Sequence, residues 1–355
     1  MRFYSSLLTL AGVLAIEAEA VRFLGRVNPA TRELTWPGTG LTFTFTGTSA
    51  SIGIESVTGT NSAELVIDDG EPIFIPNVEG SSISTPEGLT YGNHSVVLRK
   101  RSSNQFGTVF VGDVLTDGTF GCDTAPSRQI DIIGDSISVG YGLDGVLPCV
   151  NTAVTENAVK TYGALAAKAL KADYSIVAWS GKGLIRNIAT GSPDDSPLMP
   201  ELYNRYGAQD AENSYTFPKT WTPDAVVINL GTNDFSYLAY DENGQSYEAR
   251  ERLDIAAFTA GMVEFVQEIQ THYPDAEFFL LSSPMLGDGW PPGDLQHTKH
   301  VQGVTDAIAQ LGDKVHFLDW PSQGSDVGCD YHPNAATNAE QAEVLAATIG
   351  AVLGW

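Results

Sequence analysis

The sequence predicts two domains in series: an all-β jelly-roll sandwich, followed by an α/β domain whose parallel sheet carries helices on both faces. Residues 21–116 consist of short β-branched or alternating runs separated by turn residues, and no segment there has helical periodicity. After about residue 123, short apolar runs alternate with helical patterns, which is typical of a parallel sheet covered by helices. A chain of 355 residues is long enough for both domains.

The chain begins with the pattern of a secretory signal, predicted over residues 1–20. Met1-Arg2 supplies the positive start, residues 7–16 are apolar, and Ala18-Glu19-Ala20 fits a cleavage site. No later stretch approaches the apolar length that a bilayer crossing requires. We therefore expect a secreted, extracellular protein that begins at Val21, with Asn93 of the sequon Asn93-His94-Ser95 as a candidate glycosylation site.

The first domain, predicted over residues 21–122, contains five strand-like segments and a hairpin signal at Asp68-Asp69-Gly70. The segments are 41–46, 51–55, 64–67, 95–98 and 108–111. Sandwiches of this kind often bind sugars, but a packing role against the second domain fits the sequence equally well.

The second domain, predicted over residues 123–355, follows a turn-rich boundary at 117–126. Its predicted strands are 130–133, 174–178, 225–230, 278–281 and 315–318, and its predicted helices are 158–171, 247–272, 295–311 and 335–352. Ligands of open α/β sheets bind at the carboxyl ends of the strands, so residues just past each strand are the candidate site.

Ser136 follows the first of these strands, and Gly134 allows a tight turn before it. Ser136 is therefore a candidate nucleophile, although Asp135 or Ser136 would also serve simply to cap the next helix. The nearby G-x-G-x-x-G match at 140–145 lies too far beyond the strand for a dinucleotide site, and we interpret it as a flexible loop. A G-x-S-x-G elbow is disfavoured because position 138 is serine.

Three further residues follow later strands or precede the last helix. Gly181 lets a backbone N–H approach a ligand, and the Asn233 amide is suited to stabilise developing negative charge. His332, held on a loop by Pro333, offers a base of near-neutral pKa. Taken singly, Gly181 also fits an ordinary turn, and a lone histidine is more often structural.

In this order, Ser136, Gly181, Asn233 and His332 resemble the four blocks of the SGNH or GDSL hydrolase superfamily. The resemblance implies a flavodoxin-like sheet, Ser136 as nucleophile, His332 as base and the N–H groups of Ser136 and Gly181 with the Asn233 amide as oxyanion hole. It implies no cofactor.

The first domain is similar to the jelly roll that precedes the hydrolase in carbohydrate esterase family two. The similarity rests on Gly25-Arg26 and on residues 93–101. It implies a secreted serine esterase that removes acetyl groups from plant-wall polysaccharides such as xylan or glucomannan, with an acetylated polysaccharide or oligosaccharide as partner. We expect a monomer.

Two positions depart from the superfamily pattern. Trp179 stands two residues before Gly181, where asparagine is common, and Cys329 stands three before His332, where aspartate is usual. Asp330 is the acidic residue nearest to His332, and we predict that its carboxylate completes a triad. A backbone carbonyl orients the histidine in some relatives, and that alternative stays open.

The formal net charge of −24 excludes some classes of partner. An acidic surface repels phosphate backbones and anionic head groups, so we expect no nucleic-acid or membrane partner. Two other functions remain: a lipid or small-ester esterase on the same scaffold, and an inactive polysaccharide-binding protein. The first usually requires an apolar lid, of which we see no sign, and the intact set of four residues argues against the second.

Three cysteines allow at most one intrachain disulfide. We predict that Cys149 pairs with Cys329, since both should lie on the rim of the site, and that Cys122 is free. We predict no metal site, because cysteines and histidines lack ligand spacing. Trp290 and Tyr331 are candidates for stacking on sugar rings, with loop packing as the alternative.

Overall fold

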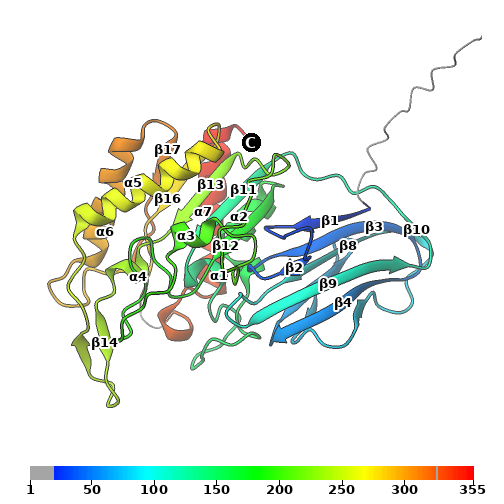
Figure 1. The fold of residues 1–355 in the computed structure, drawn as a ribbon, viewed down its shortest axis with the longest axis horizontal. Coiled ribbons are helices and arrows are strands. Elements are labelled where there is room, and N and C mark those ends of the chain that lie inside the picture. Colours follow the sequence, from blue (N-terminus) through cyan, green and yellow to red (C-terminus); the bar gives the residue numbers. More distant parts are fainter. Residues whose placement is uncertain (1–19, 325–326) are drawn as a thin grey trace, which may run out of the picture.

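The computed structural model describes residues 20–324 and 327–355, so the predicted signal sequence lies outside the described residues apart from Ala20. Figure 1 shows two domains side by side, a β-sandwich and an α/β domain. None of the helices in the described part of the chain has the length and apolar character that a bilayer crossing requires.

The first domain is a sandwich of two antiparallel sheets. One sheet has the order β1-β3-β8-β5-β6, with β10 also on β3, and the other has the order β2-β9-β4-β7. The strands are β1 (Val21–Leu24), β2 (Glu33–Leu34), β3 (Gly40–Gly47), β4 (Ala50–Gly59), β5 (Ala63–Ile67), β6 (Ile73–Ile75), β7 (Ser82–Ser84), β8 (Gly92–Lys100), β9 (Gly107–Thr116) and β10 (Thr119–Phe120). Alternate residues such as Phe43, Ile54, Val96 and Val111 face one shared core.

The five predicted strands fall within β3, β4, β5, β8 and β9. The predicted hairpin is confirmed: Asp68 and Asp69 both have positive φ, and the Gly70 N–H donates to the Ile67 carbonyl at 2.9 Å, which joins β5 to β6. The strands that were not predicted have two to four residues each, too few for a period to be recognised.

The second domain is built on a five-stranded parallel sheet of order β12-β11-β13-β16-β17. Its strands are β11 (Gln129–Gly134), β12 (Asp173–Ala178), β13 (Ala225–Asn229), β16 (Glu277–Leu281) and β17 (Val315–Leu318). Since β11 lies between β12 and β13, the chain turns to opposite sides of the sheet after its first two strands. Open α/β sheets bind their ligands at such a switch point, which here is the carboxyl end of β11.

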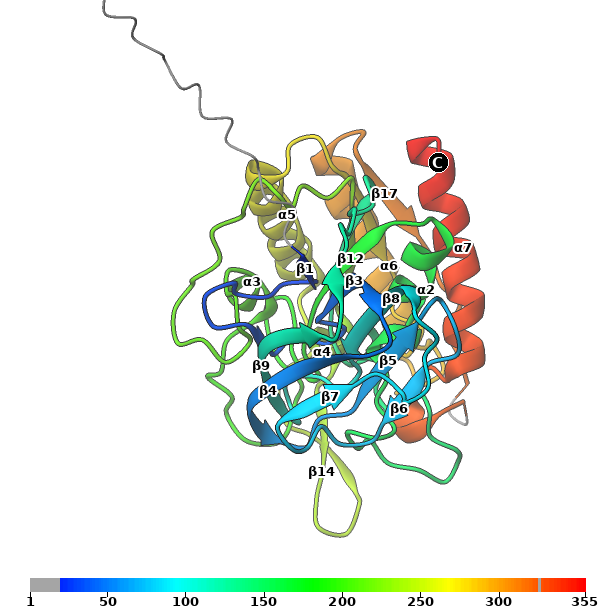
Figure 2. The same cartoon turned by 90° about the vertical axis from the view of Figure 1, so that its right-hand side faces the viewer.

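Helices cover both faces of this sheet, as predicted. Val226 and Ile228 of β13 face a core shared with α5 (Ile255–His272) and α6 (Gln296–Leu311), while Val227 between them faces α2 (Tyr162–Ala169) and α7 (Ala335–Leu353). Figure 2 shows α5 and α7 on opposite sides of the sheet. The remaining helical turns are α1 (Ser136–Val139), η1 (Ala158–Lys160), α3 (Met199–Tyr203), α4 (Thr232–Phe235) and η2 (Cys329–Tyr331).

The predicted helix at 247–272 was wrong in its first part. Residues Ser246–Glu248 form β15, which pairs with β14 (Leu238–Tyr240) in a separate hairpin. The helix starts only at Ile255, where Asp254 accepts a hydrogen bond from the Ala256 N–H. The predicted helix at 158–171 is likewise divided, into η1 and α2.

The first domain packs firmly against the second. Trp36 is fully buried within the core of the α/β domain and donates its Nε1–H to the Tyr206 carbonyl at 2.8 Å. The Arg26 guanidinium lies over the rings of Tyr203 and Tyr215 and 3.7 Å from the buried Asp131 carboxylate. The sequence left sugar binding and packing as roles of the sandwich, and these contacts establish that it packs against the second domain.

Candidate active site

Ser136 opens α1 directly after β11, at the carboxyl edge of the parallel sheet. The turn before it is tight, because a Cβ on Gly134 would lie 2.0 Å from Ser138 Oγ. Asp135, not Ser136, caps the helix by accepting a hydrogen bond from the Ile137 N–H at 3.0 Å. The Ser136 hydroxyl therefore has no part in the cap and is left for chemistry.

Asp135 is fully buried beside this serine. Burial raises the pKa of its carboxyl to about 7. Its second oxygen lies 3.3 Å from Asn233 Nδ2, which brings the third of the predicted blocks next to the first.

Asn233 lies in α4, the turn after β13, and is buried. Its Nδ2 donates to the Lys182 carbonyl at 2.8 Å, so it also contacts the second block. The neighbouring Asp234 accepts hydrogen bonds from the N–H groups of Leu184, Ile185 and Arg186, at 2.9, 2.7 and 3.1 Å. The Asn233-Asp234 pair thus fixes the loop after β12 against the nucleophile turn.

Gly181 has φ of +81°, a conformation that glycine adopts without strain. Its carbonyl accepts from the Ile188 N–H at 2.8 Å, whereas no backbone acceptor among the described residues takes its own N–H or that of Ser136. Two N–H groups on adjacent turns without a backbone partner are suited to binding an anionic oxygen.

His332 is 9% exposed and lies just before α7. Its Nδ1 lies 3.0 Å from the main-chain carbonyl of Asp330, and a carbonyl only accepts, so Nδ1 carries the hydrogen. Nε2 is buried and has no hydrogen-bond partner among the described residues. Burial lowers the pKa of His332 to about 4, so the ring is neutral at physiological pH with a free lone pair on Nε2.

The prediction that the Asp330 carboxylate orients His332 is therefore corrected by the geometry. The carboxylate is turned away and accepts a hydrogen bond from the Tyr141 hydroxyl at 2.8 Å. Asp330 has φ of +47° and Tyr331 φ of +67°, and this left-handed pair turns the carbonyl, rather than the side chain, toward the imidazole.

Tyr141 connects the histidine to the serine. Its ring stacks on His332 with centroids 4.0 Å apart and planes 20° from parallel, and its N–H donates to the Ser136 carbonyl at 3.1 Å. The structure thus brings Ser136, Gly181, Asn233 and His332 to one edge of the sheet.

The predicted disulfide between Cys149 and Cys329 is present, with Cα atoms 5.0 Å apart, and Cys122 is exposed and free. The glycine-rich stretch at 140–145 is an ordered turn rather than the predicted flexible loop. A Cβ on Gly142 would lie 2.4 Å from Cys329 Cβ, and one on Gly145 would lie 2.3 Å from Cys329 Sγ. These glycines let the nucleophile turn pack directly on the disulfide.

A cleft of about 1010 Å³ borders the site. The two predicted stacking residues, Trp290 and Tyr331, line this cleft, and their side chains are 60% and 63% exposed. Tyr240, on the β14–β15 hairpin, also lines it. The cleft reaches the catalytic groups through Tyr331, which precedes His332, and through Ile188, which is bonded to Gly181.

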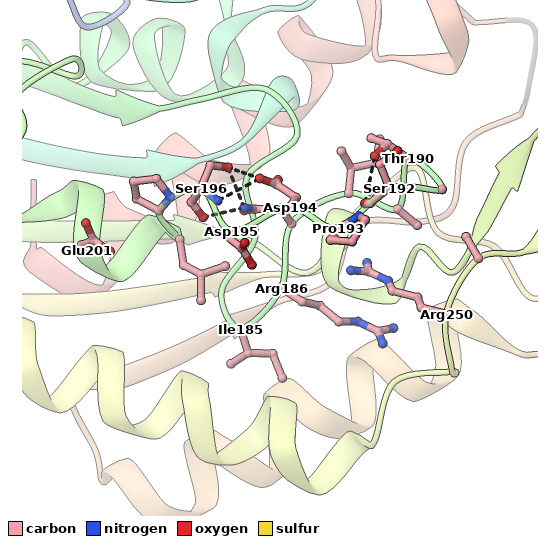
Figure 3. Close-up of a pocket in the computed structure, with 17 residues that line it drawn as sticks. Ile185, Arg186, Thr190, Ser192, Pro193, Asp194, Asp195, Ser196, Glu201 and Arg250 are labelled. Carbon is pink, nitrogen blue, oxygen red and sulfur yellow. Dashed lines mark hydrogen bonds between the residues drawn. The ribbon is translucent and has the colours of Figure 1, made fainter.

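A second cavity of about 580 Å³ adjoins this cleft, and Ile188, Ala189 and Thr190 line both. Figure 3 shows Arg186 and Arg250 toward one end of it and Asp194 and Asp195 toward the other. Arg250 donates from Nη2 to the Asn233 carbonyl at 2.8 Å and from Nε to the Ser236 carbonyl at 2.8 Å. The guanidinium therefore clamps the turn that carries Asn233.

Sequence reasoning missed three residues that shape the site. Asp234 was detectable as the acidic neighbour of Asn233. Tyr141 stood between two glycines in a stretch set aside as a loop, and Arg250 lay inside a wrongly extended helix. Their roles depend on partners between 17 and 191 positions away in the chain, such as Asn233 for Arg250 and His332 for Tyr141.

Comparisons with known proteins agree with this architecture in both domains. Residues 23–123 match the family described as Carbohydrate esterase 2 N-terminal, and residues 132–339 match the GDSL-like Lipase/Acylhydrolase family. An "Acetylxylan esterase / glucomannan deacetylase" of Cellvibrio japonicus is 33% identical over 335 residues, which cover 90% of this chain and 85% of that protein.

Two further relatives extend the comparison. The "Cellulase/esterase CelE" of Acetivibrio thermocellus is 34% identical over 92% of this chain, which spans 38% of that longer protein. The crystal structure of a Corynascus thermopiles (Myceliophthora fergusii) carbohydrate esterase family 2 enzyme plus carbohydrate binding domain has a TM-score of 0.90 and 64% identity, covering 94% of this chain and 100% of that one. The chain, with its sandwich and its α/β domain both matched, belongs to carbohydrate esterase family 2 and is a carbohydrate esterase.

Proposed function

We propose that this chain is a secreted serine esterase that removes O-acetyl groups from acetylated xylan or glucomannan through an acetyl-serine intermediate. The observation that carries the proposal is the state of His332. Its Nδ1–H is fixed by a carbonyl, and no residue in the described part of the chain occupies its buried Nε2, which is the form a general base requires. Tyr141 joins this base to the turn of Ser136.

In the acylation step, His332 Nε2 removes the proton from Ser136 Oγ as that oxygen attacks the acetyl carbonyl. The Asp330 carbonyl stabilises the imidazolium by accepting the Nδ1–H bond, and its distance of 3.0 Å is already that of a formed hydrogen bond. The tetrahedral intermediate then collapses with cleavage of the bond to the sugar oxygen, and the imidazolium gives its proton to that oxygen, which leaves as a hydroxyl.

The tetrahedral oxyanion is held by the N–H groups of Ser136 and Gly181 and by Asn233 Nδ2. One hydrogen of the Asn233 amide is donated to the Lys182 carbonyl at 2.8 Å, which orients the amide. The second hydrogen faces the Asp135 carboxylate, where the contact is long at 3.3 Å. This second hydrogen, held only by the long contact, is the one available to the oxyanion as charge develops. A water molecule activated by His332 then releases acetate and restores Ser136.

The substrate lies along the cleft that Trp290, Tyr331 and Tyr240 line. Exposed aromatic rings favour contact with the apolar faces of sugar rings. The net charge of −24 favours a neutral polymer over an anionic one. The name of the Cellvibrio japonicus relative supports acetylated xylan or glucomannan as the substrate class.

Secretion is part of the same proposal. It rests on the signal-like start of the sequence and on the Cys149–Cys329 disulfide, since disulfides persist in oxidising compartments. Asn93 is exposed on β8, where a glycan has room. We also propose that the enzyme acts as a monomer.

Acetate release from acetylated xylan, acetylated glucomannan and a long-chain lipid ester tests the proposal. We expect release from the polysaccharides and little from the lipid ester, and none from Ser136→Ala. Ser138→Ala is the matched control, because that hydroxyl sits two residues away in the same turn and hydrogen-bonds to the Tyr162 hydroxyl at 2.8 Å. A preference for the lipid ester would favour a lipid esterase, and tight polysaccharide binding without acetate release would favour a binding protein.

A further inference from the structure

A chain of hydrogen bonds runs from the sandwich to the catalytic turn. Ser103 lies in the loop after β8, and its N–H donates to one oxygen of Glu156, in the second domain. The other oxygen of Glu156 accepts from Asn151 Nδ2 at 2.8 Å. Asn151 Oδ1 in turn accepts from the Gly142 N–H at 2.7 Å. In each of these three hydrogen bonds the donor lies on the side of Ser103 or of Gly142 in a fixed order: Ser103 and Asn151 donate to Glu156, and Gly142 donates to Asn151.

The last member of this chain touches the catalytic machinery. Gly142 packs on Cys329 and follows Tyr141, whose ring stacks on His332 and whose N–H is bonded to the Ser136 carbonyl. The direction of the Gly142 N–H therefore fixes how the Tyr141 ring meets the imidazole.

The first members of the chain are sealed from solvent. Glu156, Ser103 and Lys100 are each at most 1% exposed. Lys100 Nζ donates to the carbonyls of Ser102 and Ser103 at 2.7 and 3.0 Å, which holds the loop that presents the Ser103 N–H, and to the Thr35 carbonyl at 3.4 Å. A buried carboxylate is costly unless it is hydrogen-bonded, and the bonds from Ser103 and Asn151 meet this need for Glu156. The nearby Lys100 also favours the charged carboxylate, although burial lowers the pKa of Lys100 itself to about 7.

We propose that Glu156 and Asn151 are positioning residues that couple the sandwich domain to the catalytic histidine through Gly142 and Tyr141. The sandwich is then part of the catalytic apparatus and not only a packing partner. The inference rests on the proposed esterase activity for its kinetic readout.

Exchanging the carboxylate of Glu156 and the amide of Asn151 keeps the net charge and tests this series of hydrogen bonds. Glu156→Gln presents an amide with one acceptor to two donors, and Asn151→Asp places a carboxylate against that of Glu156. Each single variant should lower kcat about tenfold with KM changed less than about twofold, the size expected for one misdirected hydrogen bond. In the double variant the introduced amide donates to the introduced carboxylate, which still accepts from Gly142, so kcat should return to within about threefold of wild type.

Asp173→Asn is the matched control. It removes a carboxylate that also joins the domains, through Arg22 and Arg99, but has no link to Gly142. It should lower Tm and leave kcat unchanged. Asn151→Ala, at a partly exposed residue, replaces Glu156→Gln if that variant does not fold, and should also lower kcat about tenfold.

Two results would overturn the inference: single variants with lowered Tm but wild-type kcat, or a double variant no faster than the slower single one. Hydrogen exchange of the Gly142 amide distinguishes failure of this inference from failure of the proposed esterase function. If the wild type released no acetate, exchange faster in the single variants than in Asp173→Asn would still support the chain, and unchanged exchange would refute it.

Discussion

The Asp330 side chain offers a direct test of how His332 is held, because its carbonyl and its carboxylate do different things. In Asp330→Asn the carbonyl keeps its 3.0 Å contact with Nδ1. Asparagine also tolerates the φ of +47° at this position, and its amide oxygen still accepts the Tyr141 hydroxyl. The variant therefore removes only the charge of the side chain.

The magnitude follows from this geometry. The lost quantity is the ionic part of one solvent-exposed hydrogen bond, about 0.5–1 kcal/mol after screening. That corresponds to a loss of kcat/KM of less than about fivefold. If the carboxylate instead completed a triad, neutralising it should cost on the order of 10⁴-fold.

The assay measures kcat and kcat/KM for acetate release from a soluble acetyl ester, with Tm as the check on folding. Tyr141→Phe is the companion variant, since it keeps the stacked ring and removes altogether the hydrogen bond that Asp330→Asn keeps without its ionic part. Neither variant should lower kcat/KM by more than about fivefold. A loss above about a hundredfold in Asp330→Asn at unchanged Tm would refute the carbonyl arrangement.

Three further outcomes are expected. Because burial lowers the pKa of His332 to about 4 and only the neutral ring acts as base, the loss of kcat/KM that comes from protonation of His332 should occur near pH 4, below any change near pH 7 from Asp135, and complete loss of activity already at pH 5.5 would contradict the site. Asn233→Ala should lower kcat by roughly a hundred- to a thousandfold with little change in KM, and an unchanged kcat would remove Asn233 from the oxyanion hole. Trp290→Ala should raise KM about tenfold for acetylated glucomannan but leave a small acetyl ester unaffected, and equal effects on both substrates would indicate that Trp290 only packs its loop.

Much of the fold could be predicted because its signals are local. The strand before Ser136, the turn at Gly134 and the alternation of strands with helices are readable within a few residues, and the strand order then places Ser136, Asn233 and His332 at one edge. The pairing of Cys149 with Cys329 followed from the same placement.

What sequence reasoning could not give depends on long-range contacts. The choice between the Asp330 carbonyl and carboxylate is decided by two left-handed residues and by Tyr141, 189 positions away. Tyr247 and Glu248 begin the stretch that was predicted as a helix, but they pair with Ala239 and Leu238 in a hairpin, and Leu238–Tyr240 of that hairpin line the cleft. Trp36, in a strand-rich domain, buries its ring in the core of the other domain, which no local pattern indicates.

The central claim is that Ser136 carries the acetyl group during turnover. Acid quenching during turnover of an aryl acetate, followed by proteolysis and mass spectrometry, measures this directly. We expect the mass of one acetyl group on the peptide that contains Ser136 and on no peptide of Ser136→Ala. Acetate release at the wild-type rate from Ser136→Ala, or an acetyl group on a different residue of the wild type, would contradict the account.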